Sequence, residues 1–170
     1  MRINGFKLFR TVAGMAMWVT VSLLLTTVGA YAQSEQSAGG NNLEGTWQIA
    51  VGLRDCNTGA TLGAPFQSLI SFARGGTATE TTSNPQFVSP IQRSPGHGVW
   101  NANSDGTYRV STIAFITNNG VLQVKQVITQ TIAMDGVNDW HTLSATVKFY
   151  NPAGVQVAGG CAAATAKRFK

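Results

Sequence analysis

Short runs of β-forming residues, separated by turns rich in glycine, asparagine and aspartate, constrain the fold of this 170-residue chain more than any other feature. After residue 42, no stretch sustains the 3.6-residue periodicity of an amphipathic helix, whereas runs of β-forming residues recur, each ended by a turn signal. Eight of these runs are predicted to be strands. They span residues 46–54, 66–74, 77–82, 98–103, 107–117, 121–132, 140–150 and 155–169.

The short connections between these runs favour a closed sheet. Gly, Asn and Asp supply the positive φ angles of tight hairpins, so most consecutive strands are expected to be antiparallel neighbours. Eight such strands leave two exposed edges unless the sheet closes. We therefore predict an all-β fold, an eight-stranded antiparallel up-and-down barrel. A two-sheet sandwich is the alternative, because the segments 55–65 and 83–97 are long enough to cross between sheets.

The first 32 residues have the three-part pattern of a secretory signal peptide. Basic residues precede a long apolar stretch, and Ala-Tyr-Ala then provides small residues before Gln33. The polar segment 33–43 is interpreted as a flexible leader, and residues 44–170 as one barrel domain. We expect a secreted or periplasmic protein with no membrane span after cleavage; a retained membrane anchor is the alternative.

Charge and cysteine content restrict the partners and the compartment. Without the signal peptide the chain keeps nine basic and seven acidic residues, and this net charge of +2 is too small to favour a nucleic-acid partner. Cys56 and Cys161 are the two cysteines, and in an exported chain they are expected to form a disulfide. The closed loop of roughly 100 residues corresponds to about 4–5 kcal/mol in the chain-entropy model.

Turn lengths decide which side chains face the barrel interior. Three-residue loops at 104–106 and 118–120 would place Asn103 opposite Thr107 and Thr117 opposite Val121, with Arg109 and Lys125 outside. Two-residue turns would shift the pairing by one residue, so that Arg109 would share a face with Phe115, Val124 and Gln130. We prefer the first pairing because an unpaired buried charge is costly. The predicted inward set includes Thr79, Thr112, Ala114, Ile116, Leu122, Val124 and Ile132.

The length of the turn between the second and third predicted strands likewise decides which of their side chains face inward. A two-residue turn at Gly75-Gly76 would place Phe72 beside Thr79 and would direct Glu80 outward. Phe66, Ile70 and Phe72 would then face the interior.

A Gly-x-Trp sequence, Gly45-Thr46-Trp47, opens the first predicted strand, and Arg168 lies near the end of the last one. In a closed meander these two ends are neighbours, so Arg168 is expected to close the barrel by a cation–π contact with Trp47. In these features the chain resembles the lipocalin-like, or calycin, barrels, and also secreted bacterial barrel proteins. A barrel of the allene oxide cyclase or dirigent kind is a second likeness.

The strand order places the two longest loops at one end of the barrel and both termini at the other. The loop end is expected to be the mouth of a cup whose interior is mainly apolar with a few polar groups, which is typical of a small-molecule site. The sequence therefore predicts an exported barrel that binds a small, mainly apolar ligand. The predicted ligand-binding residues are Phe72, Trp100, Tyr108, Gln126, Ile128 and Gln130.

Two other functions are alternatives to ligand binding. A barrel enzyme of the isomerase or cyclase type would use His97 and Asp55 as its catalytic candidates. A ligand-free envelope or surface protein would instead work through its loops or an outward apolar patch that includes Ile113 and Phe115. The sequence contains no cofactor motif and predicts no metal site; it leaves the oligomeric state open.

Overall fold

The computed structural model describes residues 42–170, so the predicted signal peptide (1–32) and most of the predicted leader (33–43) lie outside the described residues. The described part contains strands and turns but no helix. The strands are β1 (Gly45–Arg54), β2 (Thr61–Ala73), β3 (Thr77–Thr82), β4 (Ile91–Arg93), β5 (Gly96–Ala102), β6 (Tyr108–Asn118), β7 (Val121–Met134), β8 (Asp139–Tyr150) and β9 (Gln156–Arg168).

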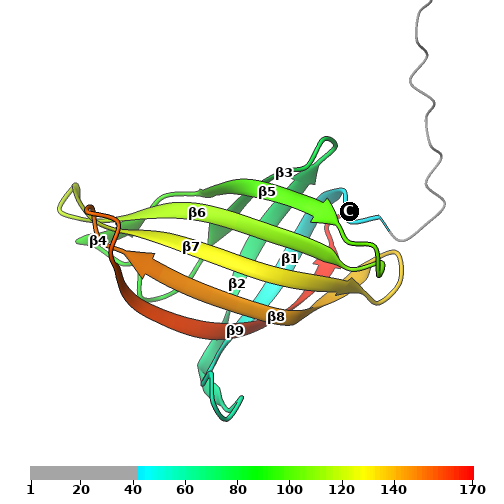
Figure 1. Ribbon diagram of the computed structural model, residues 1–170, viewed down its shortest axis with the longest axis horizontal. Helices are drawn as coiled ribbons and strands as arrows, with labels where there is room; N and C mark the ends of the chain where they lie inside the picture. Colours follow the sequence, from blue (N-terminus) through cyan, green and yellow to red (C-terminus); the bar gives the residue numbers. More distant parts are fainter. Residues whose placement is uncertain (1–41) are drawn as a thin grey trace, which may run out of the picture. The chain divides into compact units, whose positions relative to one another are not determined.

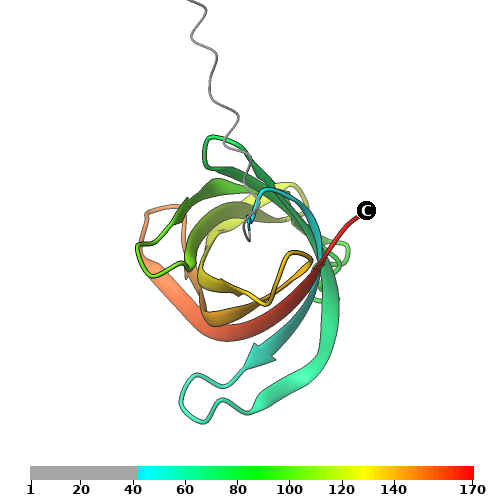
Figure 2. The ribbon, with the colours of Figure 1, turned by 90° about the vertical axis from the view of Figure 1, so that its right-hand side faces the viewer.

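The strands form a closed antiparallel barrel, as predicted (Figure 1). Eight strands make the wall in the order β1-β2-β3-β5-β6-β7-β8-β9, and the pairing of β9 with β1 completes the ring that Figure 2 shows end-on. The sandwich alternative is therefore wrong. The short strand β4, which the sequence does not predict, pairs with β6 beyond the end of β5 and lengthens that side of the wall.

The hairpin between β6 and β7 corrects one predicted turn and preserves the predicted faces. Asn119 and Gly120 have φ angles of 50° and 77°, and Asn118 pairs with Val121, so the turn has two residues rather than three. A bulge next to Ile116 then shifts the pairing by one more residue, to Phe115 opposite Lys125, so that Arg109 and Lys125 lie outside as predicted. One consequence is that Leu122, predicted to face inward, lies on the outside with 41% of its surface exposed.

The hairpin between β2 and β3 contradicts the sequence prediction. Ala73 pairs with Thr77, so the loop has three residues, with positive φ angles at Gly75 and Gly76. Glu80 consequently pairs with the buried Ile70 and faces the interior, whereas Thr79, predicted to face inward, is exposed. The one-residue difference in the turn exchanges the two faces of β3.

Large side chains fill the end of the barrel where β1 begins and β9 ends, here called the terminal end. Trp47 and Trp140 meet edge to face with ring centroids 6.2 Å apart, and both are fully buried. Leu43 is 0% exposed and accepts a hydrogen bond from Trp47 Nε1 at 2.8 Å. Leu43 therefore belongs to the core, although the sequence analysis places it in the leader.

Arg168 covers this core from the end of β9. Its guanidinium carbon lies 4.1 Å from the centroid of the Trp47 ring, directly across from it in the β1–β9 pairing. Its nitrogens donate hydrogen bonds to the carbonyl oxygens of Asn42, Glu44 and Val137. The structure thus brings the predicted barrel-closing pair together and ties two segments to it, residues 42–44 and the β7–β8 turn.

Replacing Arg168 with methionine should lower the free energy of unfolding by about 2 kcal/mol, because it removes charge-assisted hydrogen bonds and the cation–π contact. Urea denaturation followed by tryptophan fluorescence measures the change. Lys167→Met is the matched control, because Lys167 is exposed and should change stability by less than about 0.5 kcal/mol. Equal effects of the two substitutions would contradict the role given to Arg168.

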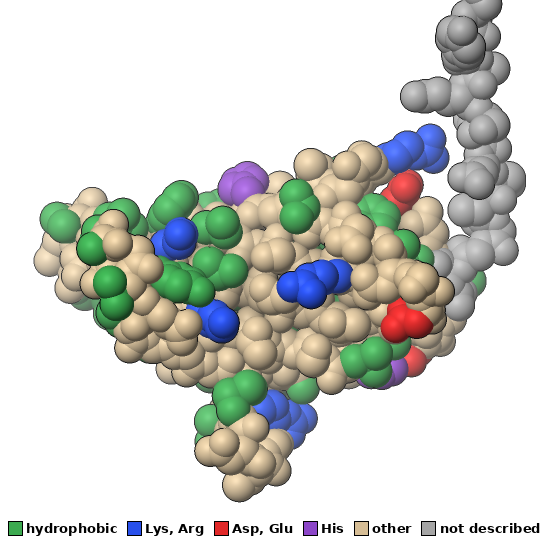
Figure 3. Space-filling view, in the orientation of Figure 1, with side chains coloured by type: hydrophobic (Ala, Val, Ile, Leu, Met, Phe, Trp, Pro, Cys, Tyr) green, Lys and Arg blue, Asp and Glu red, His purple; other side chains and the backbone are tan. Residues whose placement is uncertain are grey.

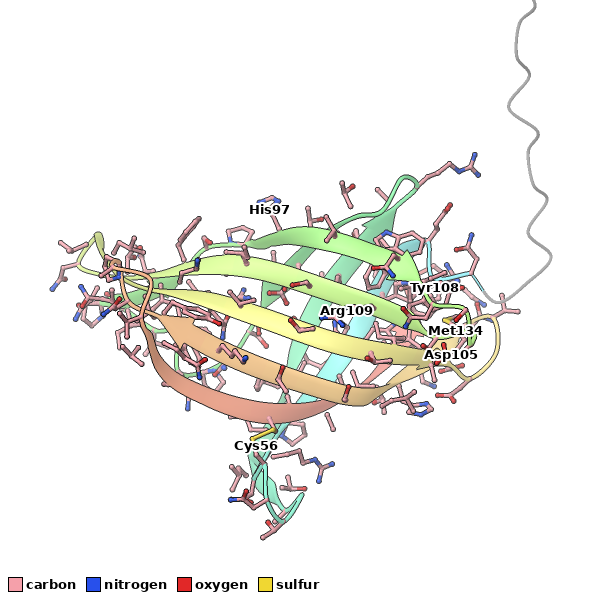
Figure 4. The ribbon with its side chains drawn as sticks, viewed as in Figure 1. Cys56, His97, Asp105, Tyr108, Arg109 and Met134 are labelled. Carbon is pink, nitrogen blue, oxygen red and sulfur yellow. A yellow bond between two sulfur atoms is a disulfide. The ribbon has the colours of Figure 1, made fainter. Side chains whose placement is uncertain are left out.

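The β1–β2 hairpin projects sideways from the barrel wall, part of the way along the barrel (Figures 1 and 2). The end opposite the terminal end, where the β6–β7 and β8–β9 turns lie, is here called the mouth end (Figure 1). β2 begins at Thr61, five residues before the predicted start, and Arg54 pairs with both Thr61 and Cys161. The predicted disulfide is confirmed: Cys56 and Cys161 are bonded with Cα atoms 5.2 Å apart. The bond fixes the base of this hairpin to β9 (Figure 4).

Candidate ligand-binding cavity

A cavity of about 260 Å³ lies inside the barrel, next to the aromatic core and toward the mouth end. This is just below the range of about 300–1,000 Å³ that is usual for small-molecule sites. Most of its wall is apolar and comes from β1, β2, β7, β8 and β9. The apolar lining includes Ile49, Val51, Leu53, Phe66, Ile70, Ile128, Val147 and Phe149.

The cavity exists because side-chain size changes along the barrel. The terminal end contains Trp47 and Trp140, whereas the cavity side of β9 carries the run Gly159-Gly160-Cys161-Ala162 followed by Ala164. Ala145 on the neighbouring strand is equally small and also lines the cavity. Small residues on two adjacent strands therefore leave a volume that larger inward side chains would fill.

One group of polar side chains interrupts the apolar wall, and we call Arg93, Glu80 and Gln126 the polar cluster. Arg93 Nη2 donates to Glu80 Oε1, and Arg93 Nε donates to Gln126 Oε1 at 2.5 Å. The Arg93 side chain is only 3% exposed and that of Glu80 only 10%. The cavity thus contains a buried ion pair held by a third polar side chain.

Three strands position the polar cluster. Arg93, at the end of β4, pairs with the buried Ile116 and therefore faces inward. Glu80 on β3 pairs with Gly96 on β5. A side chain at position 96 would occupy the space of the Glu80 carboxylate, because an added Cβ would lie 2.5 Å from Glu80 Oε1. Glycine at this position thus gives Glu80 room to reach Arg93.

The substitution Gly96→Ala should therefore destabilise the protein by about 1–3 kcal/mol, since it forces the Glu80 carboxylate away from its partner. Thermal unfolding followed by circular dichroism checks this. Gly160→Ala is the control, because an added Cβ there meets no atom within 4 Å and should change stability by less than about 0.5 kcal/mol. A Gly96→Ala variant as stable as the native protein would show that the Glu80 side chain moves away from the added methyl group at no cost in stability.

The structure divides the predicted ligand-binding residues between the two ends of the barrel. Gln126, Ile128 and Gln130 line the cavity. Phe72, Trp100 and Tyr108 pack with one another on the terminal side, with ring centroids 6.0 Å and 5.8 Å apart in successive pairs. These three aromatic residues belong to the packed core or lie against it and are not part of the cavity wall.

The structure does not bring the catalytic candidates His97 and Asp55 together. His97, predicted in a loop, lies on β5 opposite Thr79 and Ile113 and points outward (Figure 4). Asp55 lies in the β1–β2 turn, where the backbone N–H groups of Thr58 and Asn57 and the Thr58 hydroxyl donate to it. These hydrogen bonds, that of the Thr58 backbone first, lower the pKa of Asp55. Asp55 therefore stabilises its own turn as a carboxylate.

Arg93 and Glu80 are site residues that the sequence does not predict. The sequence predicts Glu80 on the outer face because it predicts a two-residue turn at Gly75-Gly76, whereas the turn has three residues. Arg93 lies in a segment without alternation, between two Ser-Pro pairs, and no periodic signal marks it as inward. The arginine nearest to Glu80 in sequence is Arg74, in the β2–β3 turn, so the sequence does not single out Arg93 as the partner of Glu80.

Comparisons with protein-family models, curated proteins and solved structures found no match. The eight-stranded antiparallel barrel is compatible with a lipocalin-like fold. Within residues 42–170, no group of three or more His, Cys, Asp or Glu side chains is arranged to hold a metal ion. In the same residues there is no helix with the length and hydropathy needed to span a membrane.

Proposed function

We propose that this protein is an exported, lipocalin-like barrel that binds a small, mainly apolar ligand in its cavity. The observation that carries the proposal is the combination of an apolar cavity of about 260 Å³ with one buried polar cluster. A protein core of this size is normally close-packed, and a buried ion pair adds little net stability compared with apolar residues. Both features are usual in a binding site, where polar groups orient an apolar ligand.

The covalent structure supports the proposed location. The Cys56–Cys161 bond is consistent with an oxidising compartment, in which disulfides form and persist. Together with the signal-peptide pattern of residues 1–32, it supports secretion or export to the periplasm. The ligand would then be taken up outside the cytoplasm, through the mouth end of the barrel.

Native mass spectrometry of the oxidised protein, purified from its source organism, tests the proposal. We expect a reproducible additional mass of a few hundred daltons that is lost on mild collisional activation. Release by organic extraction would identify the compound. Protein that carries no additional mass, and that also fails to gain one when incubated with a total lipid and metabolite extract, would contradict the proposal.

A second function, interaction through the outer surface, is favoured by one observation. Phe115 is 49% exposed and lies on the outer face of β6 with Ile113, which is also exposed. Figure 3 shows hydrophobic side chains gathered toward the mouth end of the face formed by β6, β7 and β8. Phe115→Ser would abolish partner binding under this alternative and would leave ligand binding in the cavity unchanged.

A further inference from the structure

The polar cluster is electrically balanced before any ligand binds. Arg93 carries the positive charge and Glu80 the negative charge, and the two side chains are in direct contact. A ligand head group with a further charge would be buried beside this pair without a counterion of its own, which is costly in a low-dielectric interior. The balance therefore disfavours both a carboxylate and an ammonium group at this position.

Chemistry fixes the orientation of the Gln126 side chain. A guanidinium group only donates hydrogen bonds, so the atom of Gln126 that faces Arg93 Nε must be the carbonyl oxygen. The amide nitrogen is consequently directed elsewhere and keeps two N–H donors. Gln126 lines the cavity, and its Nε2 makes no hydrogen bond within residues 42–170.

Two further polar atoms are open to the same space. Thr112 lines the cavity from β6, where it pairs with Ile128, and no hydrogen bond within the described residues engages its hydroxyl. The second carboxylate oxygen of Glu80 is likewise not used by Arg93. Within residues 42–170, Trp140 Nε1 is the one buried polar side-chain atom without a partner, so these cavity groups are not sealed off. They remain accessible to a ligand.

We infer that the polar cluster and Thr112 select a ligand with an apolar body and an uncharged head group that both donates and accepts hydrogen bonds, such as a hydroxyl. The Glu80 oxygen accepts from the head group, and Gln126 Nε2 and Thr112 donate to it. Arg54, the other cation on the wall, lies at the base of the projecting β1–β2 hairpin, where it donates to Thr61. This inference rests on the proposed function and adds the chemical class of the ligand.

Competition among three ligands of equal chain length tests the inference. N-phenyl-1-naphthylamine, a dye that fluoresces in apolar sites, is first bound to the protein at neutral pH. It is then displaced by 1-decanol, decanoate or decylammonium. We expect 1-decanol to bind about tenfold more tightly than either ion, because only the ions bury an uncompensated charge. Decanoate or decylammonium binding as tightly as 1-decanol would overturn the inference.

Two variants show whether the named atoms are responsible. Glu80→Gln leaves Arg93 without a counterion, so decanoate should gain about tenfold in affinity and 1-decanol should not. Thr112→Val removes one hydroxyl at nearly constant volume and should weaken 1-decanol binding about fivefold without changing decanoate binding. Thr112→Val keeps the test informative if Glu80→Gln fails to fold. The inference would also be overturned by the following pair of results. Thr112→Val binds 1-decanol as the native protein does, and any folded Glu80→Gln protein keeps the native selectivity.

Failure of the proposed function gives a different result. Ala145→Trp, which places an indole in the cavity, should exclude the dye from the barrel. If this variant binds the dye as well as the native protein does, the cavity is not the site and both proposals fail. If the variant excludes the dye and none of the three ligands displaces it from the native protein, only the inferred head group is wrong.

Discussion

Replacing Arg93 with methionine should lower the free energy of unfolding by about 3–5 kcal/mol, the usual cost of leaving one member of a buried ion pair without its partner. Arg93 is 3% exposed at its side chain and is the group that contacts the Glu80 carboxylate. Its removal also leaves Gln126 Oε1 without its donor. Guanidinium chloride denaturation followed by circular dichroism and by tryptophan fluorescence measures the loss.

The double variant Arg93→Met, Glu80→Leu is the control that separates charge from packing. With both charges gone, no unpaired carboxylate is buried, and stability should return to within about 1.5 kcal/mol of the native value. The same variant should lose the preference for an uncharged polar head group, because the acceptor is missing. A single Arg93→Met variant as stable as the native protein would show that the ion pair is open to solvent.

Removing the disulfide with Cys56→Ser and Cys161→Ser should have an effect of similar size. The bond joins residues 105 apart in the sequence, and the chain-entropy model gives about 4.7 kcal/mol for a loop of roughly 100 residues. Measured values for native disulfides are about 2–5 kcal/mol. We expect a loss in that range. It is measured by urea unfolding, from the midpoint and the slope of the denaturant dependence of each protein.

The disulfide also carries a local prediction, because it fixes the projecting β1–β2 hairpin to β9. Without it, backbone amides in residues 55–65 should exchange hydrogen faster, while those of the Trp47–Trp140 core should exchange at a rate set by global unfolding alone. A double serine variant that loses less than about 1 kcal/mol would indicate that pairing of β1 with β9 holds the hairpin by itself.

Turn chemistry makes the strand positions predictable from this sequence. Seven of the eight predicted strands begin and end within two residues of the observed ones, since each hairpin is bounded by Gly, Asn or Asp. Which face is buried is harder to predict, because it depends on whether a turn has two residues or three. At Asn119-Gly120 a bulge offset the error, whereas at Gly75-Gly76 nothing did and the faces of β3 were exchanged.

The cavity follows from the sequence only in part. Gln126, Ile128 and Gln130 share the inward face of β7, which alternation identifies. The division of the interior into a packed end and a hollow end depends on which residues lie at the same level across eight tilted strands, and alternation carries no such information. For that reason the sequence predicts Phe72, Trp100 and Tyr108 at the cavity, whereas they pack in or against the core.

The most direct test of the central claim is a titration of N-phenyl-1-naphthylamine into the native protein, Ala145→Trp and Ser144→Trp. Ala145 faces the cavity, and its neighbour Ser144 is on the exposed face of the same strand. We predict that Ala145→Trp lowers the affinity by about tenfold or more, while Ser144→Trp stays within about twofold of native, because only the first indole occupies the binding volume. Equal affinities for all three proteins, with all three folded, would contradict the claim that this barrel binds its ligand inside.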